Sequence, residues 1–116
     1  MIVYEGGVTK KELLFDATGT DKLNWFSESK LVNSSWTDIE TEPKNYFSIE
    51  GHSGLFRNFF INSNYDGCHN DVGWLVASTG EDCSWENSAA HHNKVLYSKL
   101  STYTNWNSNG EACLLF

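Results

Sequence analysis

Positively charged residues are scarce in this chain and lie scattered along it. Eight Lys and Arg residues stand against fifteen Asp and Glu residues, which gives a formal net charge of −7 at pH 7. A protein that binds nucleic acid needs a clustered basic surface to neutralise phosphate groups, and the sequence has no such cluster. The same charge disfavours binding to anionic membrane surfaces. The composition therefore predicts a partner other than a nucleic acid or a membrane.

Long apolar runs are also absent. No segment approaches the roughly 20 apolar residues that a membrane-spanning helix needs. The apolar stretch at residues 1–4 is too short for a signal peptide and has no basic region before it. Proline occurs once, at Pro43, and no linker, low-complexity segment or internal repeat divides the 116 residues. We expect a single domain spanning residues 1–116, without membrane insertion.

Motifs that carry catalysis are missing as well. The sequence contains no nucleophile elbow, phosphate-binding loop or zinc-ligand spacing. His91 and His92 are adjacent, so in a strand they face opposite sides and cannot bind one metal together. Cys68 and His69 are also adjacent, and such neighbours seldom act as nucleophile and base. We therefore expect a protein that binds or assembles rather than an enzyme.

Helical periodicity is lacking, whereas Asn, Ser, Thr, Gly and aromatic residues are abundant, a composition that favours strands and turns. Short apolar or alternating runs closed by turn residues mark the expected strands. These are residues 12–16, 46–50, 56–61, 73–78, 94–100 and 112–116, with weaker candidates at 30–32 and 36–40. The pattern predicts an all-β fold, an antiparallel β-sandwich of jelly-roll-like or related type with little or no helix. Residues 9–12 match a helix capping box, but the run that follows is too short for a stable helix.

The chain has three cysteines, which allow at most one intrachain disulfide. Cys68 and Cys83 flank the predicted strand at 73–78. A bridge between them would close a loop of about 15 residues and stabilise the fold by about 3 kcal/mol. The alternative is a pair of buried free thiols. Cys113 lies in the apolar final strand, where we expect a buried free thiol.

Oxygen-bearing side chains gather at the two ends of the segment between these cysteines. Calcium prefers such ligands and takes about six to eight of them. The candidate metal ligands are Asp66, Asn70, Asp71, Glu81 and Asp82, which would form a Ca²⁺ site if the two loops converge. The alternative is ordinary turn chemistry, in which Asp and Asn side chains bond nearby backbone N–H groups.

Tryptophan recurs beside asparagine in two polar segments. Trp25 follows Asn24, and Trp106 lies between Asn105 and Asn107. A sugar ring packs its C–H groups on an aromatic face, while its hydroxyls bond amide and carboxylate groups. These five residues are therefore the candidate carbohydrate-binding site. The alternative is that Trp25 and Trp106 belong to the core, as large aromatic residues usually do.

Several segments together resemble one family. They are residues 14–21, 24–27, 45–51, 67–76 and 83–86, of which 67–76, with the sequence GCHNDVGWLV, is the most specific. They are similar to a module of secreted proteins from cnidarians and other marine invertebrates, including uncharacterised skeletal organic matrix proteins of stony corals, where it occurs near fibrinogen-like or lectin-type modules. The resemblance covers most of the chain. It implies an extracellular location and a disulfide between Cys68 and Cys83, whereas Cys113 departs from the family's usual final strand.

These features predict an extracellular recognition module of the lectin-like, carbohydrate-binding kind. Its expected partner is a glycan or another component of the extracellular matrix. The glycosylation sequon at Asn33 agrees with secretion. The alternative is a structural component of an extracellular or skeletal matrix that binds Ca²⁺ or mineral through acidic loops. We expect no cofactor other than Ca²⁺.

Overall fold

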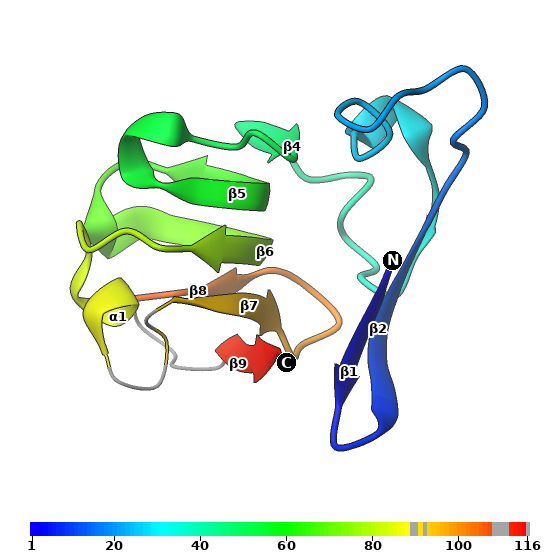
Figure 1. The fold of residues 1–116 in the computed structure, drawn as a ribbon. Coiled ribbons are helices and arrows are strands. Elements are labelled where there is room, and N and C mark those ends of the chain that lie inside the picture. Colours follow the sequence, from blue (N-terminus) through cyan, green and yellow to red (C-terminus); the bar gives the residue numbers. More distant parts are fainter. Residues whose placement is uncertain (89–90, 92, 108–111, 116) are drawn as a thin grey trace.

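The chain folds into two antiparallel sheets (Figure 1). The computed structural model describes residues 1–88, 91, 93–107 and 112–115, the last four by their backbone. The smaller sheet has the order β1-β2-β3, with β1 (Ile2–Glu5), β2 (Val8–Phe15) and β3 (Leu31–Ser34). The larger sheet follows the path β4-β5-β6-β7-β9, and β8 pairs with β6. Its strands are β4 (Tyr46–Ser48), β5 (Arg57–Tyr65), β6 (Asp71–Ser78), β7 (Lys94–Ser98), β8 (Thr104–Asn105) and β9 (Ala112–Leu115).

The all-β prediction is confirmed. In the described residues the single α-helix is α1 (Ser84–Asn87), and three short 3₁₀ turns accompany it: η1 (Glu28–Lys30), η2 (Ser53–Leu55) and η3 (Cys68–Asn70). The helical alternative for residues 9–12 is wrong, because these residues belong to β2, where buried Leu13 alternates with exposed Glu12 and Leu14. None of the helices in the described part of the chain is long and apolar enough to span a membrane.

Several details of the strand pattern differ from expectation, among them β8, which the sequence pattern does not indicate. Residues 36–40 form a turn instead of a strand, because the N–H groups of Thr41 and Glu42 both donate to the Asp38 carbonyl. β1 is a strand that the apolar pattern does not indicate. It pairs with β2 across Gly6 and Gly7, whose φ angles of 60° and 76° suit a two-residue hairpin turn.

The larger sheet is covered on both faces. Because β6 therefore needs apolar side chains on both sides, its sequence is a nearly continuous apolar run. One face packs on the smaller sheet, in a core cluster that joins Val3 and Leu13 to Ile61, Leu75 and Tyr97. The segments on either side of β3 add further buried residues to this cluster, Phe26 before the strand and Trp36 and Ile39 after it. A second cluster holds Phe60, Val76, Cys83, Trp85, Leu96 and Trp106. This packing of two sheets is consistent with a β-sandwich.

A glycine sets the close approach of β5 and β6. A Cβ atom at Gly73 would lie 2.7 Å from the Ile61 carbonyl oxygen and 2.9 Å from the Asn62 Cα atom. The register between the two strands shifts at the same place, between Ile61 and Asn62. Gly73 is part of the segment GCHNDVGWLV, so the requirement for glycine in that motif is a packing requirement.

Candidate functional site

The structure places Trp106 in the core. Its side chain is 2% exposed and stacks on Trp85, with ring centroids 5.8 Å apart and an angle of 28° between the planes. The cause is the pairing of β8 with β6, continued by a hydrogen bond from the Trp106 N–H to the Asp71 carbonyl. Trp106 therefore has no free face for a sugar ring, and the core alternative is the right one for this residue. Asn105 is half-buried, and Asn107 is exposed.

Trp25 and Trp106 do not form one site. Trp25 is half-buried against the cluster that joins the two sheets, whereas Trp106 belongs to the second cluster. The Trp25 ring meets the edges of Phe15 and Phe26 at centroid distances of 5.4 and 5.6 Å. The predicted sugar site is thus divided between two parts of the molecule.

Asn24 lies in an open hollow. The loop that follows β2 is fixed there by reciprocal bonds, in which the Asp21 N–H donates to Asn24 Oδ1 at 2.8 Å and the Asn24 N–H donates to Asp21 Oδ1 at 3.0 Å. The hollow, of about 380 Å³, is lined by this loop and by β4. Its lining includes Asn24, Ser27, Ser29 and Phe47.

A second hollow of about 500 Å³ adjoins the first, and the two share Ser27, Ser29 and Phe47. We call these two hollows together the β4 groove. In its second half, Lys44 Nζ pairs with Glu28 at 2.8 Å and lies 5.5 Å from the centre of the Trp74 ring. The charges of Lys44 and Glu28 balance each other, and the rest of the lining combines hydroxyl, amide and aromatic groups with Leu23 and one further cation, Lys30.

The predicted calcium ligands do not assemble into a metal site. Asp71 is fully buried and pairs with Arg57 Nη1 at 2.8 Å, so its charge is already matched by a cation. Asp66, Glu81 and Asp82 are exposed, and Asn70 is half-buried and closes a turn by accepting the Asp66 N–H. Among the described residues, no group of three or more His, Cys, Asp or Glu side chains could hold a metal ion.

The bridge between Cys68 and Cys83 is present, with Cα atoms 5.3 Å apart. It joins η3 to the residue just before α1. The disulfide prediction is confirmed, and the alternative of two free thiols is wrong. Cys113 lies in β9, opposite Tyr97, and its side chain is outside the described part of the structure.

Arg57 is at the centre of a buried ionic cluster that the sequence pattern does not reveal. Its Nε donates to Glu86 Oε1 at 2.8 Å, and its Nη1 pairs with Asp71 Oδ2 at 2.8 Å. The guanidinium also lies 4.9 Å from the Tyr65 ring centre and 5.0 Å from that of Trp85. The one signal available was that the only arginine of the chain stands inside an apolar strand.

The two carboxylates of this cluster have different environments. Burial raises the pKa of Asp71 to about 6, against the opposing effect of Arg57. Burial also tends to raise the pKa of Glu86, but hydrogen bonds from Arg57, Cys83 and Ser78 outweigh it, and the net shift of the Glu86 pKa is downward. Since all three charged residues are closed to solvent, we interpret the cluster as a structural element rather than as a site for substrate.

Comparison with known proteins adds no further information on function. No family model, no curated protein and no solved structure matches this chain. The resemblance to the module of coral skeletal matrix proteins therefore stays a prediction.

Proposed function

We propose that this chain is an extracellular recognition domain that binds a neutral saccharide in the β4 groove. The observation that carries the proposal is the pair of adjoining hollows that share Ser27, Ser29 and Phe47. Of the residues predicted from the sequence, Asn24 keeps its role as a ligand-binding residue. Trp25 contacts Phe26, which lines the groove, and does not line the groove itself.

The chemistry of the groove fits a sugar better than an apolar or ionic ligand. A saccharide combines C–H groups that pack on an aromatic ring with hydroxyls that both donate and accept hydrogen bonds. Phe47 offers the ring, and Asn24, Ser27 and Ser29 offer the amide and hydroxyl groups. The open shape of the groove suits one or two units of a longer glycan.

An extracellular location is supported by the disulfide. Disulfides form and persist mainly in oxidising compartments and are rare in the cytosol. The bridge between Cys68 and Cys83 closes over the second core cluster, where a stable covalent link contributes to the fold. The alternative function, a matrix component that holds Ca²⁺ through its acidic loops, has less support, because Asp71 is paired with Arg57.

The test is a screen of neutral oligosaccharides on a glycan array, followed by titration of the best hit by NMR. We expect the backbone amides of Asn24, Ser27 and Ser29 to shift. Asn24→Ala should weaken binding at least fivefold to tenfold, because it removes one hydrogen bond to the sugar and also the bond from the Asp21 N–H that fixes the loop. Phe47→Leu should weaken it further while leaving the fold intact, since the volume of the side chain is largely kept.

Asn107→Ala is the matched control, because Asn107 is an exposed asparagine from the divided site and lies outside the groove. It should leave the dissociation constant unchanged. The proposal would be overturned if no neutral saccharide bound, or if Asn107→Ala weakened binding while Asn24→Ala did not.

A further inference from the structure

The sequence holds one acceptor motif for N-linked glycosylation, Asn33-Ser34-Ser35. Such a motif consists of an asparagine, any residue except proline, and then serine or threonine. None of the other asparagines of the chain is followed two positions later by serine or threonine. The structure places Asn33 in β3, an edge strand of the smaller sheet, with its side chain exposed. The acceptor asparagine therefore lies at the surface, where a glycan has room.

The oxygen and the nitrogen of the Asn33 side-chain amide have different roles. Its Oδ1 accepts the backbone N–H of Ser34 at 2.9 Å. A glycan attaches to Nδ2, and no group in the described part of the chain bonds to that atom. Because a glycosylated amide keeps its oxygen, the bond from Ser34 survives the modification. The fold therefore uses one atom of the amide and leaves the other for a sugar.

The outer face of the smaller sheet is apolar next to Asn33. Leu14 pairs with Asn33 between β2 and β3, so their side chains are neighbours on one face of the sheet. Ile2 pairs with Glu12, which lies two residues before Leu14 and therefore on the same face. Ile2 is 46% exposed and Leu14 is 53% exposed. Exposed apolar side chains beside an edge strand favour pairing with another chain.

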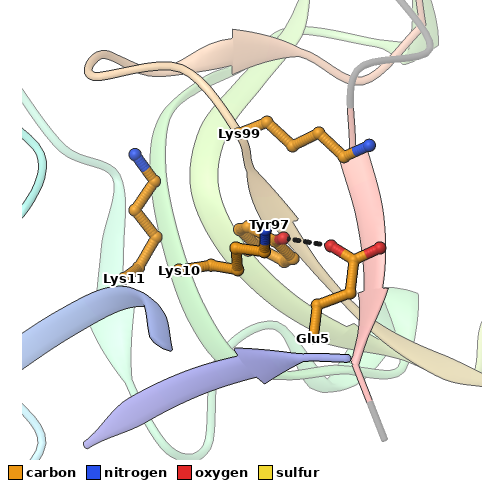
Figure 2. A pocket seen from close by; sticks show the side chains of 5 residues that line it. All are labelled: Glu5, Lys10, Lys11, Tyr97 and Lys99. Carbon is orange, nitrogen blue, oxygen red and sulfur yellow. Dashed lines mark hydrogen bonds between the residues drawn. The ribbon is translucent and has the colours of Figure 1, made fainter. Parts of the chain in front are cut away.

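The inner face of the same sheet packs on the larger sheet, where Val3 and Leu13 are buried. Figure 2 shows a polar part of this contact, in which the Tyr97 hydroxyl donates to Glu5 Oε2 at 2.7 Å. A hollow of about 400 Å³ lies beside that bond and is lined by the same two residues and by Lys10, Lys11 and Lys99. A glycan on β3 would therefore cover the outer face and leave the contact between the sheets intact.

A small hollow adjoins the attachment atom. It has a volume of about 140 Å³ and is lined by Glu12, Leu14, Asn33, Ser34 and Ser35. Free small molecules bind in cavities of about 300–1,000 Å³, so this hollow is too small for an untethered ligand. A covalent tether removes that limit, because it holds the sugar at a high effective concentration beside the hollow. There the C–H groups of the ring can pack on Leu14, and a hydroxyl can donate to Glu12.

We propose that Asn33 carries an N-linked glycan whose first sugar lies in this hollow, against Leu14. Transfer forms a bond between Asn33 Nδ2 and the anomeric carbon of a lipid-diphosphate-linked oligosaccharide. It breaks the bond from that carbon to the diphosphate oxygen and releases the lipid diphosphate together with the proton that Nδ2 loses. The inference rests on the extracellular location proposed above, since this transfer takes place in the secretory pathway. The glycan shields the edge of β3 and the apolar face beside it from pairing with a second chain.

Secretion of the full chain from eukaryotic cells behind an added signal peptide, followed by mass spectrometry of its peptides, tests the modification. Peptides that contain Asn33 should carry a glycan. Asn33→Gln and Ser35→Ala should each abolish it, whereas Ser35→Thr keeps the acceptor motif and should retain it. Asn107→Gln is the matched control, because Asn107 is exposed and lies outside an acceptor motif. A secreted chain without a glycan on Asn33 would overturn the proposal.

The contact with Leu14 is tested after an endoglycosidase has trimmed the glycan to its first sugar. Nuclear Overhauser effects should then connect that sugar to the Leu14 methyl groups. A sugar on Asn33 without these effects would contradict its placement in the hollow. Asn33→Gln should leave saccharide binding in the β4 groove unchanged, because Asn33 lines neither half of that groove. A groove that bound no saccharide would therefore overturn the proposed function alone, and an unmodified Asn33 would overturn this inference alone.

Discussion

Arg57 is buried in an apolar strand, yet its guanidinium makes several polar contacts. Its guanidinium faces two carboxylates, those of Asp71 and Glu86, and donates from Nη2 to the Cys83 sulfur at 3.7 Å. Burying these charges is costly, and the ion pairs only offset that cost while every member is present. The cluster therefore makes the fold sensitive to the loss of any one of its charges.

Replacement of Arg57 by methionine should destabilise the protein strongly. Arg57→Met keeps an unbranched side chain but leaves Asp71 and Glu86 buried without a cation, which costs about 3–5 kcal/mol. Urea denaturation at pH 7 measures the free energy of unfolding. The same change at exposed Lys22 is the control and should cost less than about 0.5 kcal/mol. Equal losses in the two variants would contradict the structural role of the cluster.

The pKa of Asp71 predicts how stability depends on pH. Because that pKa is raised from 3.8 to about 6 in the native state, the folded chain keeps a proton that the unfolded chain has lost, and stability falls as the pH rises through this window. Asp71→Asn does not titrate there. Between pH 4 and pH 7, the unfolding free energy of the wild type should therefore fall by about 2–3 kcal/mol relative to that of Asp71→Asn.

Urea melts of both proteins at pH 4, 5, 6 and 7 measure this difference. Asp66→Asn, a change at an exposed carboxylate of the neighbouring turn, serves as the control for the loss of one negative charge. A difference between Asp71→Asn and the wild type that stayed constant with pH would show that Asp71 is ionised in the native state over the whole range.

At the scale of the element, the disulfide encloses β6. Cys68 and Cys83 are 15 residues apart, and the whole of Asp71–Ser78 lies between them. The bridge restricts the unfolded chain and ties η3 to the start of α1, where the Cys83 N–H donates to Glu86 Oε2 at 2.9 Å. The disulfide thus supports the ionic cluster as well as the central strand.

Removal of this bridge should cost about 3 kcal/mol, the loop-closure term for a loop of this length. The double variant Cys68→Ser, Cys83→Ser and the reduced wild type should lose similar amounts in urea denaturation. Peptide mapping under non-reducing conditions should join Cys68 to Cys83 and leave Cys113 as the free thiol that alkylates on unfolding. A peptide that joins Cys113 to either of the other two would contradict this pairing.

At the scale of the whole molecule, the two sheets depend on each other. The smaller sheet is too small to bury a core alone, and Leu13 packs into the cluster it shares with the larger sheet. Hydrogen bonds also cross between the loops and the larger sheet, from Trp36 Nε1 to the Ser98 carbonyl at 3.1 Å and from Trp74 Nε1 to Asp38 Oδ1 at 2.7 Å. We therefore expect the sheets to unfold in one cooperative transition.

The neighbours Leu13 and Leu14 provide a test within one strand. Leu13 is 2% exposed and Leu14 is 53% exposed. Leu13→Ala should cost about 2–5 kcal/mol, and Leu14→Ala less than about 0.5 kcal/mol. Tryptophan fluorescence and far-ultraviolet circular dichroism should report the same midpoint for Leu13→Ala. Two separate transitions would mean that the larger sheet is stable without the smaller one.

The sequence by itself determined those features that depend on local pattern. The apolar run at 73–78 predicts β6 because a strand with both faces covered needs apolar side chains on both sides. The spacing of Cys68 and Cys83 at the two ends of that run allowed the bridge to be predicted, with the resemblance in support. The hydrophobic pattern also indicated the all-β class, since no segment has helical periodicity.

Only the tertiary structure decided which distant side chains meet. Trp106 is buried because β8 pairs with β6, and Asp71 is unavailable to a metal because Arg57 lies beside it. Lys10 and Lys99 look scattered in the sequence but line one pocket, because a bulge in β2 and the packing of two sheets bring them there. Periodicity reports the face on which a residue lies, whereas a site depends on contacts between strands far apart in the chain, which local pattern does not contain.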